Sequence, residues 1–305
     1  MVVFEQMAIF FLIMMLGYYI RHKNLITQQS HRQLTSIVVN FTAPLLILSC
    51  SLPDSSAISR EQLLHAIGVL CFLQVLMVAS AILLPILIRC SKDDAPVYNS
   101  MCVCTNIVFI SMPVVLMIYG TEAMLYMAIF IVLNNIVFFS YNIWILTHGK
   151  GQKFNFKAAF NPCLLSCLVL LAMMVLNLNL PVFLQKLFGM VGNISPALSM
   201  MLIGAALYEV SFRQLFGDPR MWLFSALKML IVPIAIMYAV MAVTDDRYLI
   251  GTCFVSVAAP SGVMVVMFTT LLRPNSLSVA SRGISLTTTI SVLTIPLVGL
   301  ACGIA

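Results

Sequence analysis

The sequence contains very little charge for a chain of 305 residues. Only 9% of its residues are charged and 62% are hydrophobic, and the mean hydropathy is +1.06. A soluble domain carries about 25% charged residues, which keep its surface hydrated. The composition therefore excludes a soluble globular protein and indicates a chain embedded in a lipid bilayer.

Acidic side chains and histidines are missing from the centres of the apolar runs. The ten Asp and Glu residues and the four histidines all lie in expected loops or toward helix ends. An enzyme would need catalytic groups that converge inside the bundle, so we expect no catalytic activity. Most of the nine cysteines lie in apolar runs with no His or acidic residue near them, so neither a disulfide framework nor a metal site is predicted.

Long apolar runs dominate what remains. A helix needs about 20 residues to cross the hydrocarbon core of a bilayer. Ten runs meet this length, over Val2–Ile20, Leu34–Leu52, Leu63–Ile88, Tyr98–Tyr119, Ala123–Thr147, Phe160–Leu178, Met190–Tyr208, Met221–Val243, Tyr248–Leu272 and Ile284–Gly303. We therefore predict an all-α integral membrane protein with ten transmembrane helices.

Basic residues concentrate in alternate loops between these runs. The odd-numbered loops hold twelve of them: Arg21, Lys23, Arg32, Arg89, Lys92, Lys150, Lys153, Lys157, Arg213, Arg220, Arg273 and Arg282. The even-numbered loops hold three: Arg60, Lys186 and Arg247. Since basic loops stay on the cytoplasmic side, both termini are predicted to be non-cytoplasmic. The net charge of +6 belongs to these loops, so we expect no nucleic-acid partner.

The chain divides into two similar halves. A cut at the polar connection gives residues 1–150 and 151–305, each with five predicted helices. Because five is odd, the second half enters the membrane in the opposite orientation, as in the inverted repeats of secondary transporters. The positions of four prolines agree with two halves of about equal length, because Pro44 and Pro196 are 152 residues apart and Pro113 and Pro260 are 147 apart.

The fourth and ninth helices are predicted to be broken near their centres. Pro113 and Pro260 each follow small and polar residues, and proline removes a backbone donor and clashes with the preceding turn. Broken backbone at membrane depth survives only inside protein or beside a water-filled cavity. The half-helices after each proline would point positive N-termini at the midplane, which favours an anion, most simply a carboxylate. The preceding halves bring carbonyl ends, which could hold a cation.

Four segments resemble the auxin efflux carrier family of membrane transporters. They are Asn106–Pro113, Ser195–Leu207, Val257–Val263 and Thr287–Pro296. The resemblance implies inverted five-helix repeats like those of bile-acid symporters, elevator-like alternation, and a carboxylate bound where the broken helices cross. The long cytoplasmic loop of many plant carriers is absent here, so the bacterial malate permeases of the family are the nearer match.

The candidate substrate-binding residues surround the two expected breaks. They are Asn106, Ser111, Pro113, Ser256, Pro260 and Ser261, although an amide packing helices and hydroxyls capping free backbone are alternatives. Lys228 and Asn134 lie inside predicted spans and are candidates for attracting the anion or for ion coupling. For Lys228 the simpler interpretation is a side chain that snorkels to the interface.

The expected function is therefore a permease that moves a small organic anion across the cell membrane by alternating access. Without an intramembrane acid, coupling could use Na⁺, use H⁺, or be absent, which leaves a uniporter. No cofactor is expected. A channel and a non-transporting membrane sensor are the alternatives. Gly299 and Gly303 form a small-xxx-small pair that could pack a homodimer.

Overall fold

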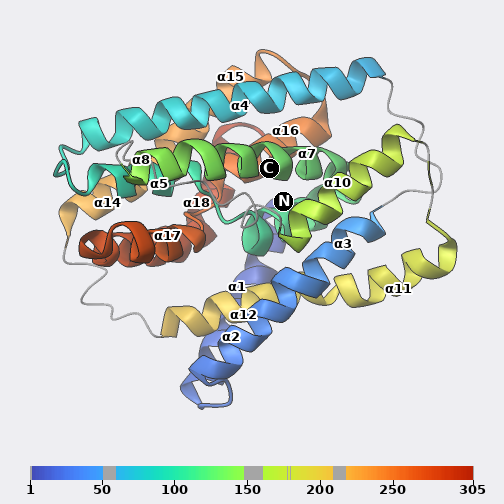
Figure 1. The fold of residues 1–305 in the computed structure, drawn as a ribbon, viewed down its shortest axis with the longest axis horizontal. Helices are drawn as coiled ribbons and strands as arrows, with labels where there is room; N and C mark the ends of the chain where they lie inside the picture. The colour runs from blue at the N-terminus through green and yellow to red at the C-terminus, as the bar shows by residue number, and fades with distance from the viewer. Residues whose placement is uncertain are drawn as a thin grey trace.

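A computed structural model describes residues 2–50, 60–147, 161–176, 178, 180–208 and 218–304 of the chain. Over these residues the fold is helical, with no strand beyond a single isolated bridge (Figure 1). The expected boundary at residues 150–151 and the basic loop with Lys150, Lys153 and Lys157 lie outside the described residues.

The elements of the first half follow the five predicted runs. They are α1 (Val2–His22), α2 (Gln28–Ile37), η1 (Val38–Thr42), α3 (Ala43–Ser49), α4 (Arg60–Leu87), α5 (Ala95–Val103), η2 (Ile107–Ser111), α6 (Met112–Tyr119), α7 (Glu122–Val137), η3 (Phe138–Asn142) and α8 (Ile143–Thr147). Among them α2 to α3 form one continuous helical rod, and so do α7 to α8.

The second half continues in the same way. Its elements are α10 (Pro162–Val175), α11 (Val182–Gly192), α12 (Ile194–Tyr208), α14 (Pro219–Ala226), η4 (Leu227–Ile231), α15 (Val232–Met241), α16 (Arg247–Ala258), α17 (Met264–Leu272), η5 (Pro274–Ser276) and α18 (Leu277–Ala301). In the described residues, five helical segments are long and apolar enough to cross a membrane, and four apolar helices are shorter. The chain is thus a multi-pass helical protein, and a count of ten crossings stays a prediction.

Prolines inside the helical rods widen single turns. The π-helical segments η1, η2 and η4 each end immediately before a helix with proline in its first two positions: Pro44, Pro113 and Pro233. Proline has no N–H and its ring clashes with the carbonyl one turn earlier, so the preceding turn relaxes into wider spacing. The expected break at Pro113 is therefore wrong, because the helix passes through Pro113 without interruption.

The helices pack in two groups (Figure 1). One group contains α1 to α3 and α10 to α12, with α1 lying along α12 and both α10 and α11 against α3. The other contains α4, α5, α7, α8 and α14 to α18. A buried apolar cluster around α5, η3, α14, α17 and α18 belongs wholly to the second group. The segments η2 and α6, which form the second half of one broken helix, contact both α1 and α12 and so connect the two groups.

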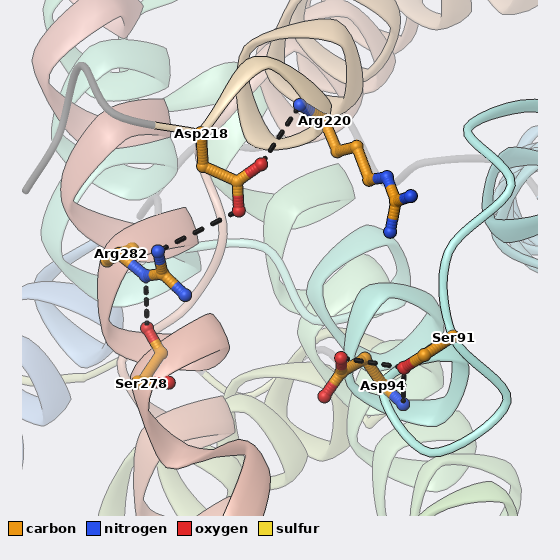
Figure 2. Close-up of polar contacts among 6 residues, drawn as sticks. All are labelled: Ser91, Asp94, Asp218, Arg220, Ser278 and Arg282. Carbon is orange, nitrogen blue, oxygen red and sulfur yellow. Dashed lines mark hydrogen bonds and ion pairs between the residues drawn. The ribbon is translucent and has the colours of Figure 1, made fainter.

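Polar residues of three expected cytoplasmic loops meet at one end of the second group (Figure 2). The Asp218 carboxylate lies 3.8 Å from the Arg282 guanidinium. Nearby, the Ser276 hydroxyl donates to Asp94 at 2.7 Å, and Arg273 donates to the Asp93 carbonyl at 2.9 Å. Loops three, seven and nine thus share one side of the molecule.

Candidate functional site

The site is formed where two broken helices cross. Cys104 to Asn106 separate α5 from η2, and Ala259 to Val263 separate α16 from α17. Thr105 and Ser261 form an antiparallel bridge between the two breaks. The Asn106 N–H donates to the Pro260 carbonyl at 2.8 Å, and the Gly262 N–H donates to the Cys104 carbonyl at 2.7 Å. Each break therefore satisfies backbone groups of the other.

Local sequence explains why the chain leaves the helix at these points. Ala259 is extended, as the residue before a proline tends to be, and α16 ends immediately before it. Gly262 lies so close to the other break that a Cβ there would come within 2.9 Å of both the Cys104 sulfur and the Thr105 carbonyl oxygen. Only glycine allows the two backbones to approach this closely.

Ser261 holds the crossing in place. Its hydroxyl donates to the Met101 carbonyl at 2.8 Å, and its N–H donates to the Thr287 hydroxyl at 3.3 Å. Thr287 lies on α18 and in turn donates to the Gly283 carbonyl at 2.8 Å. The Ser261 hydroxyl thus caps the last turn of α5, which was the alternative to substrate contact.

Lys228 reaches the same crossing from η4. Its side chain is 3% exposed, and its ammonium donates to the Ala259 carbonyl at 2.9 Å. The expectation that it snorkels to the interface is wrong, because the carbonyl end of α16 offers it a partner inside the protein. A cation is favoured there by the negative end of the helix dipole.

Asn134 serves the other broken helix in a similar way. It is 5% exposed on α7, and its side-chain amide donates to the Val103 carbonyl at 3.4 Å. Val103 is the last residue of α5. Both half-helices that end at the crossing therefore have a side-chain donor near their last carbonyls, a charged amine at α16 and a neutral amide at α5.

The other predicted residues are not equally close to the crossing. Asn106 is the N-cap of η2, is 5% exposed, and makes no side-chain hydrogen bond to the described part of the chain. Ser111 and Ser256 lie in the adjoining helices and are fully buried, and neither hydroxyl has a partner among the described residues. Pro113 lies beyond η2, away from the break. Of the predicted residues, only Asn106, Pro260 and Ser261 therefore lie in the breaks that form the crossing.

Two helix N-termini start at the crossing. The segment Ile107–Tyr119 begins after Asn106, and α17 begins at Met264. The first amides of a helix lack partners in the helix and give its N-terminus a partial positive charge. Two such N-termini close together favour an anionic group between them.

The sequence interpretation missed several residues of the site. Thr105 forms the bridge and its hydroxyl is buried without a described partner, and Thr287 supports Ser261. A polar side chain within an apolar run is a signal for Thr105, whereas the role of Thr287 is identified only by packing.

The chain matches the model of a known protein family. A family model described as a membrane transport protein matches the chain twice, over residues 2–155 and 146–298. Together the two matches cover almost the whole chain. No curated protein matches it.

Proposed function

Because this chain belongs to the membrane transport protein family, that of the auxin efflux carriers, and is a membrane transporter, we propose that it moves a small organic anion by alternating access. The substrate is a carboxylate, as for a malate permease-like member of the family. It binds at the crossing of the two broken helices, near Asn106, Pro260 and Ser261.

The observation that carries this proposal is the pair of helix N-termini at one point. The segment from Ile107 and the helix α17 both begin at the crossing, and their breaks are joined at Thr105 and Ser261. Two partial positive charges at one position favour an anionic group, and a carboxylate can accept hydrogen bonds from both. Asn106 adds a side-chain amide that has no other partner among the described residues.

The duplicated family match supports the proposed inverted repeat. One model matches residues 2–155 and again residues 146–298, which divides the chain close to residue 150. An odd number of helices in each half would orient the halves oppositely. Loops three, seven and nine meet at one end (Figure 2), which agrees with a common cytoplasmic side and with termini on the other side.

Uptake into proteoliposomes tests the proposal. The purified protein is reconstituted and offered a panel of labelled mono- and dicarboxylates, neutral analogues and organic cations. We expect saturable uptake of a carboxylate. Uptake that does not saturate would indicate a channel, and transport of only neutral or cationic compounds would overturn the anion proposal. No transport of any compound would favour a membrane sensor.

An Asn106→Ala variant tests the location of the site. Losing one hydrogen bond to a charged group removes about 1.5–3 kcal/mol of binding, so we expect carboxylate uptake to fall roughly 10- to 100-fold at low substrate concentration. Asn193→Ala is the matched control, because Asn193 is an exposed amide outside the crossing. Normal uptake by Asn106→Ala at equal reconstitution would remove this residue from the site.

A further inference from the structure

We propose that one end of the second group of helices binds the phosphate headgroup of an anionic phospholipid through Arg89, Lys92 and Arg220. This inference goes beyond the proposed function and does not depend on which compound is transported. It follows from which cations at this end lack partners and from the apolar surface beside them.

The basic residues at this end fall into two sets. Arg282 pairs with Asp218 at 3.8 Å. Arg273 donates to the carbonyls of Leu146 and Asp93, at 2.7 and 2.9 Å. The others are exposed and have no side-chain partner among the described residues: Arg89, Lys92 and Arg220. Their charges are therefore available to a ligand.

Acidic side chains nearby do not neutralise this end of the molecule. The Asp94 carboxylate accepts hydrogen bonds from two serine hydroxyls, and Asp218 is already paired with an arginine. Over residues 89–94, 218–220 and 273–282 the chain has five basic and three acidic residues. Positive charge is therefore in excess, which favours an anionic ligand.

Two segments from different halves of the chain bring the three cations together. Arg89 and Lys92 lie in the loop between α4 and α5. Arg220 lies in the first turn of α14, close enough to Cys90 of this loop to interact electrostatically with its thiol. Figure 2 shows the Arg220 side chain extending toward the same loop. An anion at this loop is therefore attracted by both segments.

The backbone of Arg89 supports a binding role for its side chain. Arg89 has a φ of 49°, in the left-handed region that favours glycine and is unfavourable for a residue with a Cβ. Its guanidinium has no partner among the described residues, so no side-chain contact offsets this cost. Unfavourable backbone of this kind is concentrated at ligand-binding sites. A bound phosphate would provide the contact that the chain itself does not.

The surface beside these cations favours a lipid over a soluble anion. Just before Arg89, Ile86 and Leu87 on α4 are 68% and 63% exposed, and Leu223, one turn after Arg220, is 48% exposed. Acyl chains cover such apolar faces in a bilayer, and the headgroups of the same lipids lie at the helix ends. Arginine binds phosphate through two parallel N–H donors, and basic pockets between helices hold anionic headgroups. A phospholipid thus matches both the apolar faces and the charges.

Lipid titration of the purified protein tests the inference. The melting temperature in detergent is measured against added dioleoyl phosphatidylglycerol and, separately, dioleoyl phosphatidylcholine, which has the same acyl chains and no net charge. A ligand of the folded state raises the melting temperature as its concentration rises. We expect a saturable rise with phosphatidylglycerol and an apparent affinity at least tenfold weaker for phosphatidylcholine. Equal effects of the two lipids would overturn the inference.

Removing the three charges tests the location of the site. Each basic side chain near an anionic lipid contributes about fivefold in affinity. We therefore expect at least a tenfold loss of apparent affinity for phosphatidylglycerol in the triple variant Arg89→Gln, Lys92→Gln and Arg220→Gln. Wild-type affinity in this variant would overturn the site. If it does not fold, Arg220→Gln alone is measured, with an expected loss of about fivefold and the same contrary outcome.

The matched control removes the same amount of charge from other positions. The exposed residues chosen are Arg32, Lys186 and Arg247, each replaced with Gln. We expect this protein to keep the wild-type affinity for phosphatidylglycerol. An equal loss in both triple variants would show a response to net charge alone and would overturn the site.

Soluble anions distinguish a lipid from free phosphate. Inorganic phosphate and glycerol phosphate replace the lipid at constant ionic strength, and we expect neither to raise the melting temperature. A rise as large as that caused by phosphatidylglycerol would make this a site for soluble phosphate and overturn the lipid assignment. No measurement in this series uses a carboxylate, so its failure leaves the proposed transport function untouched.

Discussion

At the scale of single residues, the crossing depends on polar side chains that support backbone groups. Ser261 donates to the Met101 carbonyl and Thr287 accepts from the Ser261 N–H. These bonds lie in a fully buried region, where an unsatisfied polar group cannot turn to water. Ser261, which was expected to touch the substrate, is therefore also one of the residues that shape the site.

Replacing Thr287 with Val tests this support. The change keeps the side-chain shape but removes the acceptor of the Ser261 N–H, and a buried donor left unsatisfied costs about 1–3 kcal/mol. We expect a lower melting temperature in detergent and slower uptake. Thr289→Val is the control, since Thr289 is exposed and its hydroxyl bonds only the Ser285 carbonyl in its own helix. Equal melting temperatures for both variants would contradict the prediction.

At the scale of helices, proline has two different effects in this chain. Pro260 lies within the break itself, whereas Pro113 lies in the segment that follows the other break and only widens a turn. The break after α5 involves Cys104, Thr105 and Asn106, none of which is a proline. Proline therefore identified the broken helix in both halves but located the break in only one.

The two prolines are predicted to respond differently to alanine. Pro113→Ala restores a backbone donor in a continuous helix, so we expect the melting temperature and uptake to change little. Pro260→Ala allows α16 to extend into the break, which would pull the Pro260 carbonyl away from the Asn106 N–H, so we expect uptake to fall at least several-fold. Both variants are compared in proteoliposomes at equal protein content. A larger loss for Pro113→Ala would contradict this interpretation.

Glycines set the distance between α1 and α12. A Cβ on Gly204 would lie 1.9 Å from the Met14 carbonyl oxygen, and one on Gly17 would lie 2.1 Å from that of Met201. The two helices thus touch backbone to backbone at both positions. Close packing through small residues is a main source of helix association in membranes, where the hydrophobic effect does not drive it.

Gly204→Ala is therefore expected to force α1 and α12 apart. We expect a loss of about 2 kcal/mol or more of stability, seen as a lower melting temperature, because overpacking at a close contact typically costs about 1–3 kcal/mol. Gly68→Ala is the matched control, because a Cβ on Gly68 meets nothing within 4 Å. The control should be neutral or slightly stabilising, since alanine favours helix by about 1 kcal/mol over glycine. A stable Gly204→Ala protein would show that the helices can separate freely.

At the scale of the whole molecule, the loops divide between two ends. Asp94, Asp218 and Arg282 lie near one another at one end of the bundle (Figure 2). Arg273 donates to the Asp93 carbonyl, and Ser276 donates to Asp94, which joins the same loops. The Tyr126 hydroxyl donates to Asp246 at 2.6 Å, and His65 bonds Thr244 at 3.2 Å. These bonds join the beginnings of α7 and α4 to the loop between α15 and α16, which is expected on the opposite side. The charge pattern of the loops and their packing thus agree.

Labelling of introduced cysteines tests the sidedness. Lys92→Cys and Asp245→Cys place thiols at two exposed positions, one in each group of loops. In intact cells, a membrane-impermeant maleimide should label Asp245→Cys and leave Lys92→Cys unlabelled until the membrane is permeabilised. The wild-type protein controls for its native cysteines. The reverse pattern would place both termini in the cytoplasm.

The sequence by itself determined that the chain lies in a lipid bilayer, that its fold is helical and that two of its helices are broken. Low charge and long apolar runs require a bilayer, where isolated backbone polar groups are not tolerated and helix is the simplest answer. Polar residues beside Asn106 and Pro260 in otherwise apolar runs indicated the crossing, and the family resemblance to the auxin efflux carriers is confirmed by the family match.

Only the tertiary structure decided which groups meet there. The partner of Lys228 is a carbonyl 31 residues away, and that of Ser261 is on a helix 160 residues earlier. Local sequence cannot specify such pairs, because they depend on how two broken helices pack against each other. The same packing decided that Lys228 stays inside, because the Ala259 carbonyl offers its ammonium a partner. It also decided that the break precedes Pro113, because backbone groups of residues 104–106 pair with those of the other break.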